Sequence, residues 1–206
     1  MSSYKEGQTH QLMNRFEEEG FTAEDLTKLG QFKDLAGIRG ILHGTHEIVT
    51  KKHTIDLGAP PQLPFNRAKV EKHEGKGVVE IELRSDDNLY IGGKKVELFL
   101  TESQKGDSRI VGHELRSELE SGEWVLLNSN VLDYIYDHPE LFPEHWKKDE
   151  NGETRYIFFW GSVFRGPSFG GLCVRYLFWG GVSLLRYYGW LTSGWVRQGP
   201  SASVAS

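Results

Sequence analysis

The C-terminal segment from Thr154 to Ser206 combines arginines with aromatic residues and contains no Asp or Glu. Thirteen aromatic residues lie between Tyr156 and Trp195, and the segment has five arginines: Arg155, Arg165, Arg175, Arg186 and Arg197. Guanidinium groups hold phosphate, and aromatic rings stack on bases at about 1–3 kcal/mol per base. This combination suits single-stranded nucleic acid, although exposed rings could equally contact sugar rings or a protein.

The charge of the chain is divided unevenly. The whole sequence has 24 basic and 29 acidic residues, a net charge of -5. Taking the five arginines away leaves 19 basic against 29 acidic residues before Thr154, a net charge of about -10 against +5 for the C-terminal segment. The segment therefore either contacts an anionic ligand or docks on the acidic remainder of its own chain. Mild overall acidity argues against a protein dedicated to duplex DNA.

We expect the working surface to consist of those segment residues that stay exposed. Arg175 and Trp179 fall on one strand face by alternation, with Leu177 between them, so they could form one patch. The competing interpretation is a strand buried on both faces, because Tyr156 to Phe164 is apolar at almost every position. The candidate binding residues are Arg165, Arg175, Trp179, Arg186, Trp190 and Trp195.

Three histidines, His43, His46 and His53, raise the question of a metal site. Three imidazoles can hold zinc, but this spacing matches no compact site and no single helix places all three on one face. A missing or misplaced ligand removes such a site, so we interpret them as ordinary surface histidines. The sequence predicts no metal and no cofactor.

Evidence for catalytic residues is weak. Cys173 lies between apolar residues, where a thiol is usually a small buried hydrophobe with a raised pKa rather than a nucleophile. Glu114, Glu118 and Asp133 could pair for hydrolytic acid–base work, but they fall on polar helix faces, where we expect solvated charges. No GxxxxGK[ST], GxGxxG or HExxH motif is present, and we expect no catalytic residue.

The N-terminal region, residues 9–48, predicts three helices. The first ends at Gly20, Thr22 and Asp25 resemble a capping box for the second, and the third carries an apolar stripe from Leu35 to Leu42. A helix-turn-helix would need more base-contacting side chains than Arg39 and His43. A helical cap or a dimerisation hairpin is the favoured interpretation.

The remainder predicts an antiparallel sheet with two helices packed on one of its faces. Strands are expected at 78–84 and at 89–91 with 95–100, the last two joined at Gly92-Gly93, and helices at 113–120 and from Asn130. The aromatic segment predicts a three-stranded meander with turns at 166–171 and 180–181. The small polar residues beyond Gln198 predict a disordered end.

The expected fold is therefore α+β. Residues 1–55 form a small helical unit, the proline-containing residues 56–66 a linker, and residues 67–206 an α+β domain that ends in the aromatic meander.

Several segments are similar to a family of short uncharacterised proteins that recur in the genomes of candidate-phylum bacteria. They are GFTAEDLTKLGQF, GHELRSELE, LNSNVLDYIYDHPELFPEHW and residues 156–195 with FFWG and CVRYLFW. The resemblance covers most of the chain and implies no activity, because that family has no assigned function. This chain differs at 166–170 and 192–194, where Asp-rich turns are expected.

The sequence thus predicts a cytoplasmic, non-enzymatic binding or scaffold protein. Its partner is an unknown protein or a second copy of the chain, and no membrane segment is visible. One cysteine is in keeping with a reducing compartment. The first alternative is single-stranded nucleic-acid binding through the arginine and aromatic meander, and the second is a hydrolase that uses carboxylates of the middle region.

Overall fold

The computed structural model describes residues 6–46, 52–105, 109–167 and 170–204, and the chain divides into two compact units, Met1–Lys51 and Lys52–Ser206. This division precedes the expected linker, because strand β1 (His53–Asp56) already pairs antiparallel with β3 (Val78–Leu83). Residues 56–66 therefore belong to the second unit. None of the helices in these ranges combines the length and the hydropathy needed to cross a bilayer.

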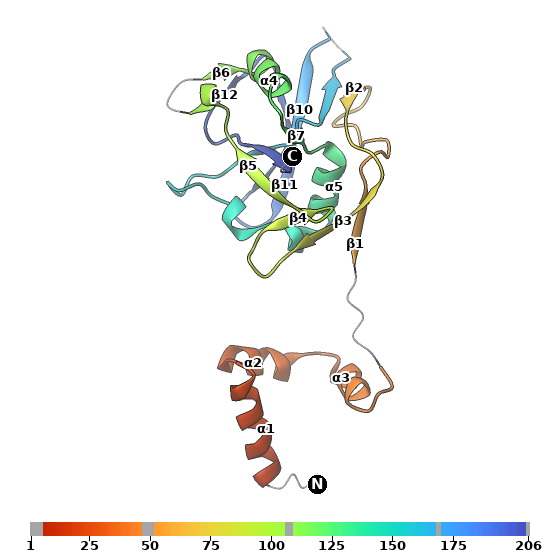
Figure 1. The fold of residues 1–206 in the computed structure, drawn as a ribbon, viewed down its shortest axis with the longest axis vertical. Coiled ribbons are helices and arrows are strands. Elements are labelled where there is room, and N and C mark those ends of the chain that lie inside the picture. Colours follow the sequence, from red (N-terminus) through yellow and green to blue (C-terminus); the bar gives the residue numbers. More distant parts are fainter. Residues whose placement is uncertain (1–5, 47–51, 106–108, 168–169, 205–206) are drawn as a thin grey trace. The chain divides into compact units, whose positions relative to one another are not determined.

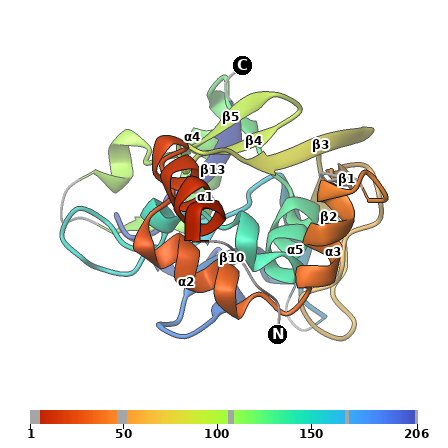
Figure 2. The same ribbon diagram turned by 90° about the horizontal axis from the view of Figure 1, so that it is seen from below.

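The first unit contains the three expected helices, α1 (Glu6–Glu18), α2 (Ala23–Gln31) and α3 (Leu35–Leu42), shown as separate short helices in Figure 2. The predicted capping box is present: the Thr22 hydroxyl accepts from the backbone N–H of Asp25, and the Asp25 carboxylate accepts from the backbone N–H of Thr22. Many large apolar side chains of the unit remain exposed, namely Leu12, Met13, Phe21, Phe32, Leu35, Ile41 and Leu42.

The second unit is built on a mixed sheet (Figure 1). Its central order is β1-β3-β4-β5-β13-β8-β10-β9-β2, with β11 added to β10 and β7 to β13, and every pair is antiparallel except β13 with β8. The remaining strands are β2 (Lys69–His73), β4 (Leu89–Ile91), β5 (Lys94–Phe99), β7 (Val125–Leu126), β8 (Ile157–Phe158), β9 (Ser162–Arg165), β10 (Leu172–Trp179), β11 (Leu184–Trp190) and β13 (Ser201–Val204). With the helices, this is the α+β fold that was predicted.

Smaller elements complete this unit. Strands β6 (Ile110–Val111) and β12 (Gly194–Trp195) form a separate two-stranded ladder. Short 3-10 helices lie at η1 (Glu102–Gln104), η2 (Pro139–Leu141) and η3 (Glu144–Trp146).

The predicted hairpin at Gly92-Gly93 is confirmed. Both glycines have positive φ, 57° and 78°, which a tight turn between twisted strands requires. In β3, Ile81 is buried and the alternate glutamates are exposed, as the alternation indicated.

The aromatic meander is present as β9-β10-β11, and the predicted turn at Gly180-Gly181 lies between β10 and β11. The other predicted turn, 166–171, includes residues 168–169, which lie outside the described residues. Its first strand is split into β8 and β9 at Gly161. A Cβ atom at Gly161 would approach the carbonyl oxygen of Leu126 to 2.6 Å, so the chain bends there against a neighbouring backbone. Alternation alone does not reveal this close approach.

The two helices of this unit, α4 (Gly112–Ser121) and α5 (Ser129–Asp137), cover opposite faces of β10. Leu115 of α4 packs in one cluster with Val174, whereas Leu132 of α5 packs in another with Leu177. Val174 and Leu177 are three residues apart on one strand and therefore point to opposite sides. The prediction that both helices share one face is wrong.

Helix α5 is capped by Asn128, not by Asn130. The Asn128 side chain accepts from the backbone N–H groups of Asn130 and Val131, at 3.1 and 3.3 Å. The Asn130 amide instead donates to the carbonyl oxygens of Asp56 and Ala59. The prediction failed because both asparagines are good cap residues, and only the tertiary contacts of Asn130 decide between them.

The predicted disorder beyond Gln198 is also wrong for the described residues, which end at Val204. Strand β13 lies inside the sheet, where it pairs with β5, β7 and β8, and Ser201, Ala202 and Ser203 are buried. Small side chains suit a crowded position between strands. A prediction from composition and position in the chain therefore missed this strand, because burial and hydrogen bonding decide whether a terminus is ordered.

Candidate binding site on the β10–β11 hairpin

The register of β10 and β11 sorts their side chains onto two faces. Tyr176 lies opposite Tyr187, and Leu177 lies opposite Arg186. Residues opposite each other in a ladder point to the same side, and neighbours along a strand point to opposite sides. Tyr176, Phe178 and Tyr187 therefore lie on one face, which we call the aromatic face, whereas the rings of Trp179, Tyr188 and Trp190 lie on the other. Both arginines lie on the other, which we call the helix side because α5 packs there.

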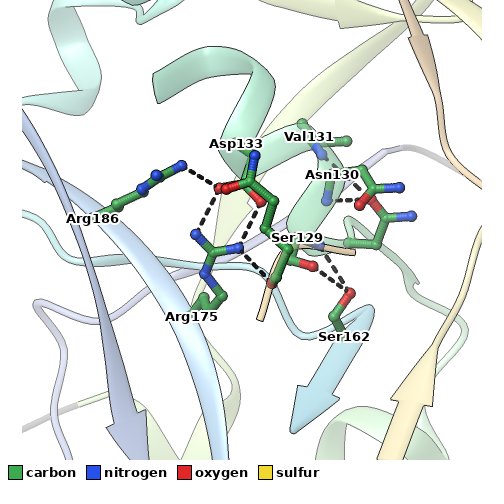
Figure 3. A network of polar contacts seen from close by, with 9 residues as sticks. Ser129, Asn130, Val131, Asp133, Ser162, Arg175 and Arg186 are labelled. Atoms are coloured by element: carbon green, nitrogen blue, oxygen red, sulfur yellow. Dashed lines mark hydrogen bonds and ion pairs between the residues drawn. The ribbon is translucent and has the colours of Figure 1, made fainter. Parts of the chain in front are cut away.

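The helix side carries a buried ion-pair cluster (Figure 3). Both terminal nitrogens of Arg175 donate to the Asp133 carboxylate at 2.6 Å, and Arg186 Nη1 donates to Asp133 Oδ1 at 2.6 Å. Arg175 is 4% exposed and Asp133 is 6% exposed. Two cations and one anion leave an excess of one positive charge. The expectation that Asp133 is a solvated carboxylate is wrong.

The proline-containing segment of residues 60–65 covers the rings on the helix side. Arg175 Nη1 donates to the Gln62 carbonyl at 3.2 Å. The Phe65 ring packs against Tyr188 and Trp190, with centroids 4.9 and 5.7 Å apart. The segment that the sequence suggested as a linker is thus docked on aromatic residues of β11.

The C-terminal arginines are largely neutralised by acidic residues that precede Thr154. All five arginines are among the described residues, and four of them form ion pairs: Arg165 with Glu71, Arg175 and Arg186 with Asp133, and Arg197 with Glu153. Arg155 Nη1 donates to the carbonyl of His145. Of the two explanations for the uneven charge, docking on the acidic remainder of the chain accounts for these contacts.

Several of the candidate binding residues are therefore not exposed as expected. Arg175 is buried against Asp133, and Trp179 is half-buried beneath Lys147, whose Nζ lies 4.1 Å from the ring centroid. The prediction that they share an exposed patch is wrong, because α5 covers that strand face. Trp195 is 5% exposed, and Trp190 is half-buried against Phe65.

The aromatic face carries the most exposed ring of the β10–β11 hairpin, that of Tyr187. Tyr187 is 57% exposed and Tyr156, which precedes β8, is 38% exposed. Tyr176 and Phe178 are half-buried between them. The centroid of Phe178 lies 5.2 Å from that of Tyr156 and 6.0 Å from that of Tyr187, so the four rings form a continuous apolar surface.

A cavity of about 260 Å³ opens at one end of these rings. Its walls include Tyr156, Tyr176, Phe158 and Trp195, together with three glycines. At one of them, Gly189, a Cβ atom would lie 3.3 Å from the Trp195 ring, so the glycine lets that indole pack against the strand. Burial, followed by the neighbouring Tyr156 and Tyr187, raises the pKa of Tyr176, which keeps its hydroxyl protonated as a hydrogen-bond donor.

The tyrosines of this surface were not among the binding residues predicted from the sequence, which were arginines and tryptophans. Tyr187 and Tyr156 are exposed, whereas Tyr176 is half-buried, as are Trp179 and Trp190. Strand alternation could have indicated these tyrosines, because Tyr176 directly follows Arg175 and must therefore lie on the opposite face of the strand.

The Cys173 thiol and the Ser162 hydroxyl are both buried and therefore not accessible to a substrate. Cys173 is fully buried, and burial raises the pKa of its thiol to about 12, in agreement with the prediction of a small buried hydrophobe. Ser162 contacts His73 Nδ1 at 2.7 Å and accepts from the N–H and the hydroxyl of Ser129. Ser162 is fully buried, so its hydroxyl is not accessible as a nucleophile to a substrate. Its contacts instead join β9 to β2 and α5, and Figure 3 shows those with Ser129.

Comparison with protein-family models, with curated proteins and with solved structures gives no match for this chain. Membership in the family of short candidate-phylum proteins therefore stays a prediction, and the candidate site is interpreted from its own geometry.

Proposed function

We propose that this chain is a non-enzymatic protein-binding module whose aromatic face takes an extended, uncharged, proline-rich segment of a partner protein. The observation that carries the proposal is the accessible surface of Tyr156, Tyr176, Phe178 and Tyr187, which ends in an apolar cavity. Aromatic-lined grooves are a general solution for polyproline recognition, because a polyproline helix is already extended and loses little entropy on binding.

The distribution of charge supports an uncharged ligand. Arg175 and Arg186 are the only charged residues of β10 and β11, and alternation directs both to the helix side. Neither strand thus places a cation on the aromatic face. Tyrosine adds a large contact area with few rotatable bonds and a polar hydroxyl, which suits a peptide carrying backbone carbonyl groups.

The chain itself provides a precedent. On the helix side, its own segment of residues 60–65, with three prolines, lies against aromatic residues of β11 through Phe65. The aromatic face of the same hairpin presents exposed rings. A partner segment of similar composition would cover them as the chain's own segment covers the helix side.

Fluorescence anisotropy of a labelled synthetic proline-rich peptide, titrated with the full chain, tests the proposal. Tyr187→Ala and Tyr156→Ala should each weaken binding by about tenfold, because each removes an accessible ring from the contact surface. Tyr187→Phe keeps the ring and should bind nearly as wild type. Tyr90→Ala, on β4, is the control for loss of a tyrosine elsewhere.

Absence of binding would reject the peptide class, and so would equal binding by wild type and Tyr187→Ala. A glycine–serine peptide of the same length controls for non-specific contact. A soluble neutral polysaccharide, tested by affinity electrophoresis, identifies the other uncharged ligand class that exposed rings can accept.

A second candidate function, single-stranded nucleic-acid binding, is favoured by one pocket. A cavity of about 260 Å³ is lined by Arg175, Arg186 and Tyr187 together with Gln62 and Pro64, and the Arg186 side chain is 31% exposed there. A phosphate could meet Arg186 while a base stacks on Tyr188, which lines the same pocket and points to the same face. This function predicts RNA binding that weakens steeply with salt and is lost in Arg186→Gln, whereas peptide binding should be unaffected by that change.

We also infer a cytoplasmic location, supported by the single cysteine, which is held as a buried thiol.

A further inference from the structure

Three potential metal ligands from distant parts of the sequence meet at one end of α5. They are His53 at the start of β1, His138 at the C-terminal cap of α5, and Glu140 in η2. One ligand atom from each residue lies within 4.8 Å of the others. His43 and His46, which lie nearest to His53 in the sequence among the histidines before it, belong to the first unit and are not part of this group.

Local structure explains why the three side chains converge. Tyr134 and His138 are one helical turn apart on α5, and their ring centroids lie 4.5 Å apart. The His53 ring packs on both, at 5.9 Å from Tyr134 and 5.0 Å from His138. Pro139 cannot continue the helix, and the turn that it starts brings Glu140 back to His138.

We propose that His53, His138 and Glu140 form a binding site for a divalent transition-metal ion, with zinc the best match. Two imidazole nitrogens and one carboxylate oxygen are a ligand set that zinc accepts, with a fourth position left for water or an external ligand. The histidines are half-buried and Glu140 is exposed, so an ion can enter from solvent.

The distances fit such an ion. His138 Nδ1 and Glu140 Oε1 lie 3.2 Å apart. Two ligands bound to one tetrahedral zinc at about 2.0–2.1 Å are separated by about 3.3 Å. This pair is therefore already at the spacing that the metal needs. The His53 ligand atom lies within 4.8 Å of the other two, so it has to move closer by at most about 1.5 Å.

A supporting contact orients the third ligand. His53 Nδ1 lies 3.2 Å from the hydroxyl of Tyr134, so in the proposed site Nε2 would bind the ion. Hydrogen bonding through the second ring nitrogen is the usual way in which a metal-binding histidine is held. The bound ion would join β1, the first strand of this unit, to the end of α5.

The test is a titration of the chelator-treated full chain with Zn²⁺ in competition with a chromophoric chelator. Wild type should take up one equivalent with micromolar or tighter affinity. His138→Ala, His53→Ala and Glu140→Gln should each weaken binding at least tenfold. His145→Ala is the matched control, because that imidazole is exposed and bonds to Asp87, and it should bind as wild type.

A second readout separates this site from the other histidines. Zn²⁺ should raise the Tm of wild type and of the double variant His43→Ala/His46→Ala, but not that of Glu140→Gln, a conservative change at an exposed residue. The proposal is overturned if no stoichiometric zinc is bound. It is equally overturned if Glu140→Gln and His138→Ala retain the affinity of wild type.

Discussion

Asp133 accepts one hydrogen bond of 2.6 Å from each terminal nitrogen of Arg175, in a pair that is almost fully buried. Arg186 donates to the same carboxylate, so one anion joins α5 to both strands of the hairpin. Because removal of one partner leaves a buried charge unpaired, the second unit should be sensitive to a single change at this contact.

Asp133→Asn should lower the free energy of unfolding by about 3 kcal/mol, because Arg175 would keep its charge without a counter-ion in the interior. Urea denaturation measures the difference. Glu114→Gln, an exposed carboxylate on α4, is the control and should change stability by less than about 0.5 kcal/mol. A stable Asp133→Asn variant would show that the two arginines are solvated.

Glu71 should contribute to stability in a pH-dependent way. Its hydrogen bond to Arg165 holds the pKa of the Glu71 carboxyl below its usual value. A lowered pKa in the folded state stabilises the fold above the unfolded pKa of about 4.3, and this contribution is lost as the pH falls through the folded pKa.

Wild type should therefore lose stability more steeply than Glu71→Gln below about pH 4.3. Denaturation curves collected from pH 6 to pH 3, a range of about three units around that value, give the comparison. Parallel pH profiles for the two proteins would contradict the expectation.

Cys173 should be protected from thiol reagents in the native protein. With a thiol pKa of about 12, about one molecule in ten thousand is ionised at pH 8, and the sulfur is fully buried. A thiol reagent such as Ellman's reagent should react with the folded chain at least a hundredfold more slowly than with the chain in urea. Rapid reaction without denaturant would mean that β10 opens readily.

Strand β13 should be essential to the sheet. Ala202→Asp would place a charge at a fully buried position between strands and should cost more than about 4 kcal/mol or prevent folding. Val182→Asp introduces the same charge at a residue that is 91% exposed and should be nearly neutral. Circular dichroism and urea denaturation compare the two. If both variants are equally stable, β13 does not pair as described.

Much of the second unit's local structure could be read from single-sequence patterns. The alternation around Ile81, the glycines at 92 and 93 and the helical spacing of Leu115 and Leu119 each matched an element that the structure contains. These patterns succeed because periodicity records which face of an element is buried.

The candidate site was predicted less well, for reasons that Arg175 and Tyr176 make clear. These neighbours must lie on opposite faces of β10, and the sequence determines that much through alternation. Which face is covered depends on where α5 packs, and that packing buries Arg175 while leaving the ring side partly open.

The sequence by itself determined the α+β class, the strands of the meander and the uneven distribution of charge. Tertiary structure alone decided that the arginines pair with acids of the same chain, that β13 enters the sheet and that His53 meets His138 and Glu140. The reason is physical. The periodicity of a segment reports which face of that one element is buried. These contacts instead join residues far apart in the chain, and which residues meet depends on how separate elements pack.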